Sequence, residues 1–220
     1  MPDTERFQQA LALHLQGEAA SAQKLCEEIL VTQPEHFEVL SLLAVIAAQT
    51  GNSMQAAELL GRAVSVDPDH PLAFFYRASA LHENGQWDAA LAGYSRAIEL
   101  NPDFGDAYLK RGNVHYALGR YDAALADYDL ALALKPKDAE AHFNRAVLLD
   151  RSGRLEAAVE SYGRAIEIKT DYAEAHYNLG TALHRLKQWD AALASYNRAI
   201  ESRAGFAEAY ANRAVVQSEL

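Results

Sequence analysis

Asparagine recurs in the second half of the chain at a spacing that suggests a way of binding a peptide. Asn144, Asn178 and Asn212 are separated by a constant 34 residues. A primary amide can donate a hydrogen bond to a peptide carbonyl and accept one from a peptide N–H. Amides at this spacing could hold the main chain of an extended peptide without reading its side chains. The alternative is that asparagine is simply common at a solvated position, and the residues alone leave both interpretations open.

Other reactive side chains lack the neighbours that catalysis or metal binding would need. His142 and His176 also lie 34 residues apart, but equivalent residues on stacked helices are about 8–10 Å apart, whereas zinc bonds are near 2 Å. Cys26 is the only cysteine, which excludes an internal disulfide and favours a small apolar filler. Neither an activated nucleophile nor a glycine-rich phosphate loop is present. We therefore expect no catalytic residue, no metal, no cofactor and no enzyme activity.

The elements that position these residues are set by a repeat of 34 residues. An alanine stands twelve residues before each of four equally spaced prolines. These prolines are Pro34, Pro68, Pro102 and Pro136. A fixed period of this length is typical of a solenoid, in which each unit buries its apolar face only against its neighbours.

Numbering each unit so that proline falls at position 32 divides the chain into six units and part of a seventh. The units are 3–36, 37–70, 71–104, 105–138, 139–172 and 173–206, followed by 207–220 as the first helix of the next. Glycine at position 15 predicts the end of a first helix, and an acid at position 18 predicts the start of a second. Each unit is therefore predicted to be two antiparallel helices, and the fold to be all-α.

Small and large residues alternate between the helices in a regular way. Positions 8 and 27 carry alanine or glycine in most units, which lets helices approach closely. Position 24 is tyrosine in the third to sixth units but Cys26 in the first and Leu60 in the second. The first two units therefore depart from the pattern of the rest.

This pattern resembles the tetratricopeptide repeat family, and residues 173–206 lie close to that family's consensus. The resemblance covers nearly the whole chain, although Arg6, Gln9 and Leu60 depart from the family's preferences. It implies a right-handed superhelical solenoid of antiparallel helix pairs. It also implies that the first helices line a concave groove, which commonly holds a peptide.

Carrying over the family's groove positions 6 and 9 gives a set of candidate peptide-binding residues. They are Leu42, Val45, Tyr76, Lys110, Asn113, Asn144, Asn178 and Asn212. The set changes from apolar residues in the early units to amides in the later ones. The amide row is similar to the asparagine ladder of O-linked glycosyltransferase repeat domains, including those of bacterial proteins of that kind.

Some members of the family bind acidic C-terminal tails of heat-shock chaperones through a clamp of basic residues. Here Leu109 and Glu174 stand at the two lysine positions of that clamp, and Asn178 replaces its arginine. Acids recur at position 2 and would repel a ligand carboxylate. We therefore expect a protein or peptide partner that is not an acidic tail.

The charge and hydropathy of the sequence limit the classes of partner that we expect. Thirty acids against twenty bases give a net charge of −10, which weakens binding to nucleic acid and to anionic membranes. The start of the sequence does not read as a secretory signal. The most apolar stretch, Val39 to Ala48, is about half the length that spans a bilayer. These features favour a cytoplasmic protein without nucleic-acid or membrane partners.

Three functions remain open. The first is a non-enzymatic scaffold that binds an extended peptide or a partner protein. The second is the substrate-recruiting arm of a larger enzyme such as an O-linked glycosyltransferase. The third is self-association, because the sequence stops at Leu220 after a single helix of the seventh unit, which leaves an apolar surface open. On that expectation the natural protein continues, or this end meets another chain.

Overall fold

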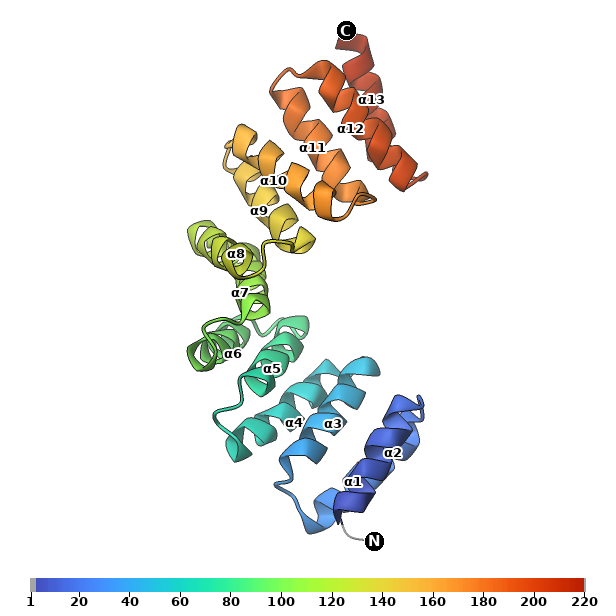
Figure 1. Cartoon of the computed structure of the whole chain (residues 1–220), viewed down its shortest axis with the longest axis vertical. Helices are drawn as coiled ribbons and strands as arrows, with labels where there is room; N and C mark the ends of the chain where they lie inside the picture. Colours follow the sequence, from blue (N-terminus) through green and yellow to red (C-terminus); the bar gives the residue numbers. More distant parts are fainter. Residues whose placement is uncertain (1–2, 220) are drawn as a thin grey trace. The chain divides into compact units, whose positions relative to one another are not determined.

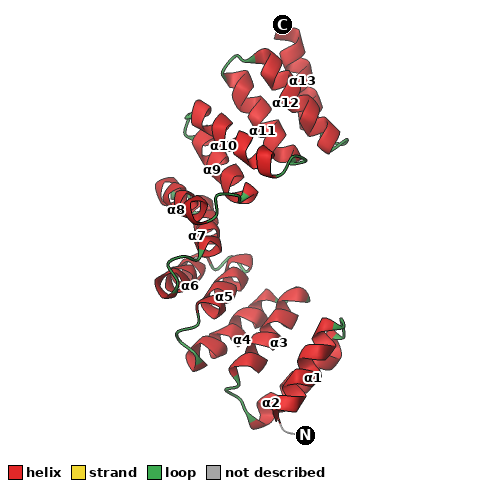
Figure 2. Cartoon of the chain, in the orientation of Figure 1, coloured by secondary structure: helices red, strands yellow, loops and turns green. Residues whose placement is uncertain are grey.

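The structure is all-helical. It is a computed structural model that describes residues 3–219, and over that range it contains thirteen α-helices and no strand (Figures 1 and 2). Leu220, the last residue of the predicted seventh unit, lies outside the described residues, as do residues 1 and 2. Within residues 3–219 each helix is too short or too polar to cross a membrane.

The helices recur at the period of the sequence, a first helix of 13 residues alternating with a second of 14. They are α1 (Asp3–Leu15), α2 (Ala19–Thr32), α3 (Phe37–Gln49), α4 (Ser53–Val66), α5 (Pro71–Glu83), α6 (Trp87–Leu100), α7 (Gly105–Ala117), α8 (Tyr121–Leu134), α9 (Ala139–Arg151), α10 (Leu155–Ile168), α11 (Ala173–Arg185), α12 (Trp189–Ser202) and α13 (Ala207–Glu219). From α1 to α6 and again from α8 to α13, helices adjacent in sequence pack against each other, and some first helices, such as α9 and α11, also touch. The predicted architecture of antiparallel helix pairs is confirmed.

The chain divides into two compact units, Met1–Val114 and His115–Leu220. The boundary falls within α7. Each unit is a stack of helices with its own buried residues.

The turn inside each pair depends on a residue in the left-handed backbone region. Gly153 has a φ of 77°, and the N–H of the next residue, Arg154, donates to the carbonyl of Leu149 at 2.9 Å. This arrangement satisfies carbonyls at the end of the first helix. Lys187 holds the same position in the sixth repeat with a φ of 59°, which is costly for a residue with a Cβ.

The second helices end two residues before the repeated proline, but they do not need it. Helix α10 ends at Ile168 although Thr170 replaces the proline, and α12 ends at Ser202 although Ala204 does. In α10 the N–H of Lys169 still donates to the carbonyl of Ala165 at 2.9 Å. The helix stop is therefore set by the packing of the repeat, and proline only reinforces it.

Buried tyrosines and small residues form the core of the stack. Four tyrosines at position 24 are at most 1% exposed, namely Tyr94, Tyr128, Tyr162 and Tyr196. Gly180 on α11 faces one of them so closely that an added Cβ would lie 2.8 Å from two ring carbons of Tyr196. The small residue at position 8 is therefore required by the neighbouring ring, as the spacing predicted.

Two glycine-to-alanine exchanges within helices should have opposite effects. Gly180→Ala should lower the free energy of unfolding by about 1–3 kcal/mol, because the buried ring of Tyr196 cannot move aside. Gly163→Ala, on α10, meets nothing within 4 Å and should raise it by roughly 0.5–1 kcal/mol through helix propensity. Urea unfolding followed by circular dichroism measures both, and equal effects would contradict the packing described.

Replacing Lys187 by glycine should stabilise the chain. Lys187 has a left-handed backbone conformation that any residue with a Cβ disfavours, whereas glycine adopts it without strain. After the entropy cost of glycine, the free energy of unfolding should rise by about 0.5–1 kcal/mol. Urea unfolding again provides the measurement, with Lys169→Gly as a control, because Lys169 has an extended backbone with φ −124°. A gain at Lys169 as large as that at Lys187 would contradict the explanation.

Candidate functional site

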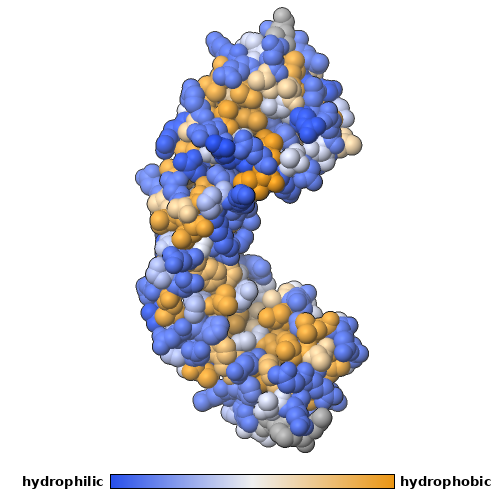
Figure 3. Space-filling view, viewed as in Figure 1, coloured by the Kyte–Doolittle hydropathy of each residue, from blue (hydrophilic) through white to orange (hydrophobic). Residues whose placement is uncertain are grey.

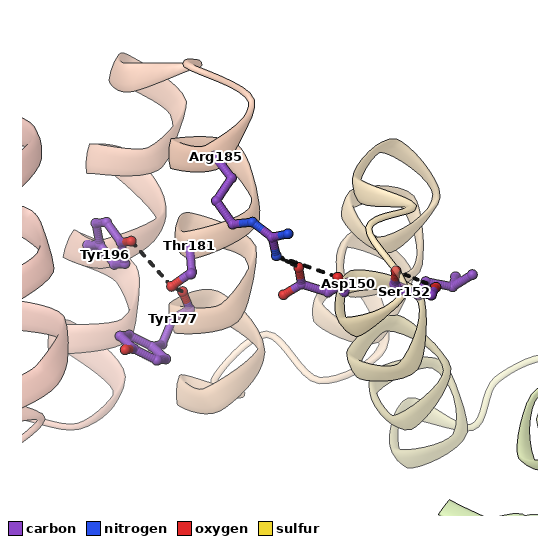
Figure 4. A network of polar contacts seen from close by, with 7 residues as sticks. Asp150, Ser152, Tyr177, Thr181, Arg185 and Tyr196 are labelled. Atoms are coloured by element: carbon purple, nitrogen blue, oxygen red, sulfur yellow. Dashed lines mark hydrogen bonds and ion pairs between the residues drawn. The ribbon is translucent and has the colours of Figure 1, made fainter. Parts of the chain in front are cut away.

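The hydroxyl of the buried tyrosine in a repeat reaches the first helix of the same repeat. In the compact unit His115–Leu220, Tyr196 donates to Thr181 Oγ1 at 3.3 Å, and Thr181 in turn donates to the carbonyl of Tyr177 at 3.2 Å (Figure 4). In the first unit, Tyr94 donates to Ser79 at 3.1 Å by the same route. A buried hydroxyl without a partner would be costly, so position 9 of these repeats is polar.

The predicted asparagines take part in this network. The amide of Asn212 donates to the hydroxyl of Tyr177 at 3.1 Å. Asn212 also lowers the pKa of Tyr196 by hydrogen bonding, against the larger effect of burial. Asn178 lowers the pKa of Tyr162, the buried tyrosine of the preceding repeat, in the same way. A primary amide has two donors and an acceptor with two lone pairs, so each asparagine keeps hydrogen-bonding capacity after these contacts. The tyrosines therefore orient the amides without exhausting them.

The repeats that lack a tyrosine also lack these polar partners. Leu60 replaces the tyrosine of the second repeat, and the two positions that would meet its hydroxyl are Val45 and Tyr76. Cys26 replaces that of the first repeat, and Leu42 stands where the later repeats carry Tyr76, Lys110 and then asparagine. In the first two repeats, apolar groove residues thus accompany the absence of tyrosine at position 24.

An apolar cavity of about 500 Å³ lies in the compact unit Met1–Val114, beside the repeats that lack tyrosine at position 24. It is bounded by α1, α3 and α5 with part of α4, and apolar surface gathers over α3 and α4 in the space-filling view (Figure 3). Its apolar walls include Phe7, Leu11, Phe37, Leu42, Val45, Leu60, Leu72 and Tyr76. Its polar walls include Glu38, Ser41, His70, Ser79 and Glu83.

The structure brings together three of the residues predicted from the sequence. Leu42, Val45 and Tyr76 all line the cavity, and their exposed fractions are 7%, 41% and 52%. The candidate set was taken from positions 6 and 9 and so did not include Phe7 and Phe37, which also line the cavity. Phe7 stands at position 5, another of the family's groove positions, and Phe37 at position 1. The substitution at Leu60 was the available signal that this part of the stack differs.

The remaining predicted residues lie elsewhere on the first helices. Lys110 and Asn113 are half-buried on α7, and Asn144 is half-buried on α9. Burial lowers the pKa of His82 on α5, and the Lys110 cation lowers it further. Lys110 and Asn113 do not line the cavity. Lys110 nevertheless influences His82 on α5, a helix that borders the cavity.

Polar pairs link neighbouring first helices in the second unit. Arg185 on α11 forms an ion pair with Asp150 on α9 (Figure 4), and His184 on α11 lies 2.9 Å from Glu219 on α13. Burial raises the pKa of Asp150, and the arginine opposes that rise. These contacts tie successive repeats together.

The histidines and the cysteine have packing roles. The ring Nε2 atoms of His142 and His176 each lie 3.0 Å from a carbonyl oxygen, that of Pro136 and of Thr170 respectively. Burial raises the pKa of the Cys26 thiol to about 11, which makes it a poor nucleophile. Residues 3–219 contain no cluster of three histidine, cysteine or acidic side chains placed to hold a metal.

Family models match the sequence over most of its length. A model described as a TPR repeat matches residues 78–119, 112–152 and 149–187. Models described as a tetratricopeptide repeat match residues 173–203 and 13–79. A search of curated protein sequences finds no match.

Several solved structures are similar in fold. The crystal structure of MamA is 25% identical, with a TM-score of 0.71, and the match covers 75% of this chain and 96% of MamA. YrrB, described as a TPR protein with an unusual peptide-binding site, is 19% identical with a TM-score of 0.71, covering 86% and 97%. PilF of Pseudomonas aeruginosa is 16% identical with a TM-score of 0.80, covering 99% and 97%. The likenesses to YrrB and PilF concern the fold alone.

Buried tyrosines should make the fold sensitive to alkaline pH. Burial raises the pKa of Tyr94 from 10.0 to about 12, against the opposing hydrogen bond with Ser79. The pKa of Tyr94 is higher in the folded chain than in the unfolded chain, so the neutral side chain stabilises the fold. This stabilisation is complete below pH 10 and is lost as pH rises through about 12. Between pH 9 and pH 12 the Tyr94→Phe variant should therefore lose on the order of 2 kcal/mol less stability than the wild type.

Urea unfolding at a series of pH values measures this difference. Tyr210→Phe is the matched control because its ring is 43% exposed. The same pH dependence in the Tyr94→Phe variant and the wild type would contradict the prediction.

Proposed function

Because the chain belongs to the tetratricopeptide repeat family, we propose that it is a non-enzymatic scaffold that binds an extended segment of a partner protein along its first helices. The fold and the family support a protein-interaction scaffold. The observation that carries the finer proposal is that Leu42, Val45 and Tyr76, chosen from sequence as ligand-facing, line one cavity. A cavity lined by apolar side chains with a few polar groups is the usual form of a ligand site.

In the second unit, we propose that the asparagine row binds the peptide main chain. Asn178 and Asn212 are held by tyrosine hydroxyls and keep donor and acceptor capacity. An amide fixed in this way loses little side-chain entropy when it binds, which favours affinity. With Asn144 one repeat earlier on α9, the row offers contacts at the repeat spacing. Such contacts recognise a backbone and do not select a sequence.

Replacing the three asparagines should weaken every peptide ligand by a similar factor. In the N144A/N178A/N212A variant, each lost hydrogen bond should cost about 1 kcal/mol, so losing three should lower the affinity by roughly a hundredfold. Peptides with unrelated side chains, selected on an array against the wild type, are titrated by calorimetry. Unchanged affinity in the variant would remove the asparagine row from the proposal.

A control separates binding from the structural role of the amides. The Y162F/Y177F/Y196F variant removes the hydroxyls that contact Asn178 and Asn212 but keeps the amides themselves. It should retain more affinity than the asparagine variant. If both variants lose binding only in proportion to their loss of thermal stability, the asparagines act through folding alone.

A further inference from the structure

We propose that the cavity between α1, α3 and α5 binds a bulky apolar side chain of a peptide whose flanking residues are lysine or arginine. This inference rests on the proposed scaffold function and names the class of partner. It concerns only the unit Met1–Val114, and it is independent of the asparagine row in the other unit.

The cavity exists because a tyrosine is missing. In the sixth repeat, Tyr196 fills the equivalent space and its hydroxyl bonds to Thr181. In the second repeat the same positions are Leu60 and Val45, and both line the cavity. Leucine lacks the outer part of an aromatic ring, so the space between the first helices stays open and apolar. An apolar side chain from a partner can occupy it and restore the packing found in the other repeats.

The size and lining of the cavity suit an apolar anchor. Its volume of about 500 Å³ falls within the range of about 300–1,000 Å³ found for ligand clefts. Phe7, Phe37 and Leu72 add apolar walls, and the exposed ring of Tyr76 adds an aromatic surface. Large apolar side chains that fill such sites contribute most of the binding energy of an interface.

The charges around the cavity select a cationic partner. Glu38 and Glu83 line the cavity. None of its described lining residues is a lysine or an arginine. Glu83 accepts a hydrogen bond from the Ser53 hydroxyl at 2.5 Å, and Glu38 lies 3.0 Å from the His36 ring. The serine hydroxyl is neutral and leaves the charge of Glu83 in place. Carboxylates beside apolar walls attract lysine and arginine and repel the head group of a fatty acid.

The test uses the full chain and labelled peptides of matched design. The first peptide has a leucine and phenylalanine core flanked by lysines, the second has the same core flanked by glutamates, and the third replaces the core by serine. Fluorescence anisotropy should show binding of the lysine peptide, weakening as sodium chloride is added, and affinities at least about tenfold lower for the other two. Equal binding of the lysine and glutamate peptides would overturn the charge assignment.

Filling the cavity should abolish binding without harming the fold. The L60Y/V45T variant copies the Tyr196 and Thr181 pair, so its new hydroxyl has a partner. It should melt at or above the wild-type temperature and bind the lysine peptide at least about tenfold more weakly. If this variant does not fold, Y76A offers a second test, because Tyr76 is 52% exposed and its loss should spare the fold. Full affinity in a folded L60Y/V45T, or in Y76A where the first does not fold, would overturn the proposal.

Charge-matched variants test the acids. E38Q/E83Q should weaken the lysine peptide and flatten its dependence on salt. E58Q/E160Q removes the same charge from exposed residues outside the cavity lining and should leave both unchanged. Equal effects of the two variants would mean that net charge, and not the cavity, attracts the peptide.

The outcomes separate this inference from the proposed function. If the lysine peptide does not bind but array-selected peptides bind in a way that depends on the asparagines, the inference fails and the scaffold proposal stands. If neither kind of peptide binds, both fail. If an apolar dye binds the cavity and L60Y/V45T removes it while no peptide binds, the cavity takes a small molecule and the inference is wrong.

Discussion

The packing of the buried tyrosine against the small residues of neighbouring helices is the constraint on which the rest of the structure depends. Tyr196 lies so close to Gly180 that a single added carbon would collide with its ring. This closeness fixes the separation of the helices and leaves the tyrosine hydroxyl pointing toward the first helices. The hydroxyl must then be paired, because an unpaired buried polar group is costly. The interior of a repeat thus decides part of the candidate surface on its first helix.

The two kinds of candidate surface are consequences of this one position. Where tyrosine is present, its hydroxyl requires Ser79, Thr181 or an asparagine as partner, and the first helices become polar. Where Leu60 replaces it, the polar partners are no longer needed and the space that the ring would fill becomes a cavity. The same repeat geometry therefore supplies amides in one part of the chain and an apolar, acidic pocket in another. The first suits a peptide backbone, and the second suits a particular side chain.

Sequence reasoning placed the candidate residues on the first helices of the repeats. The groove positions selected Leu42, Val45 and Tyr76, which the structure places around one cavity. The same reasoning left open whether the asparagines hold a peptide or are simply common at a solvated position, because it considered each repeat alone. The bond between Asn178 and Tyr162 crosses from one repeat to the next and depends on their mutual rotation. A fixed period in the sequence does not specify that rotation.

The sequence by itself determined the all-helical architecture, the period, the helix ends and the small-residue contacts, because each of these depends on local backbone preference or on a repeated interface. Only the tertiary structure decided which side chains share a cavity and which amides are already bonded. Those properties depend on distances between residues of different repeats, such as Phe7 and Leu72 around the space beside Leu60. Local preference cannot fix such distances, since they are set by how closely whole helices pack.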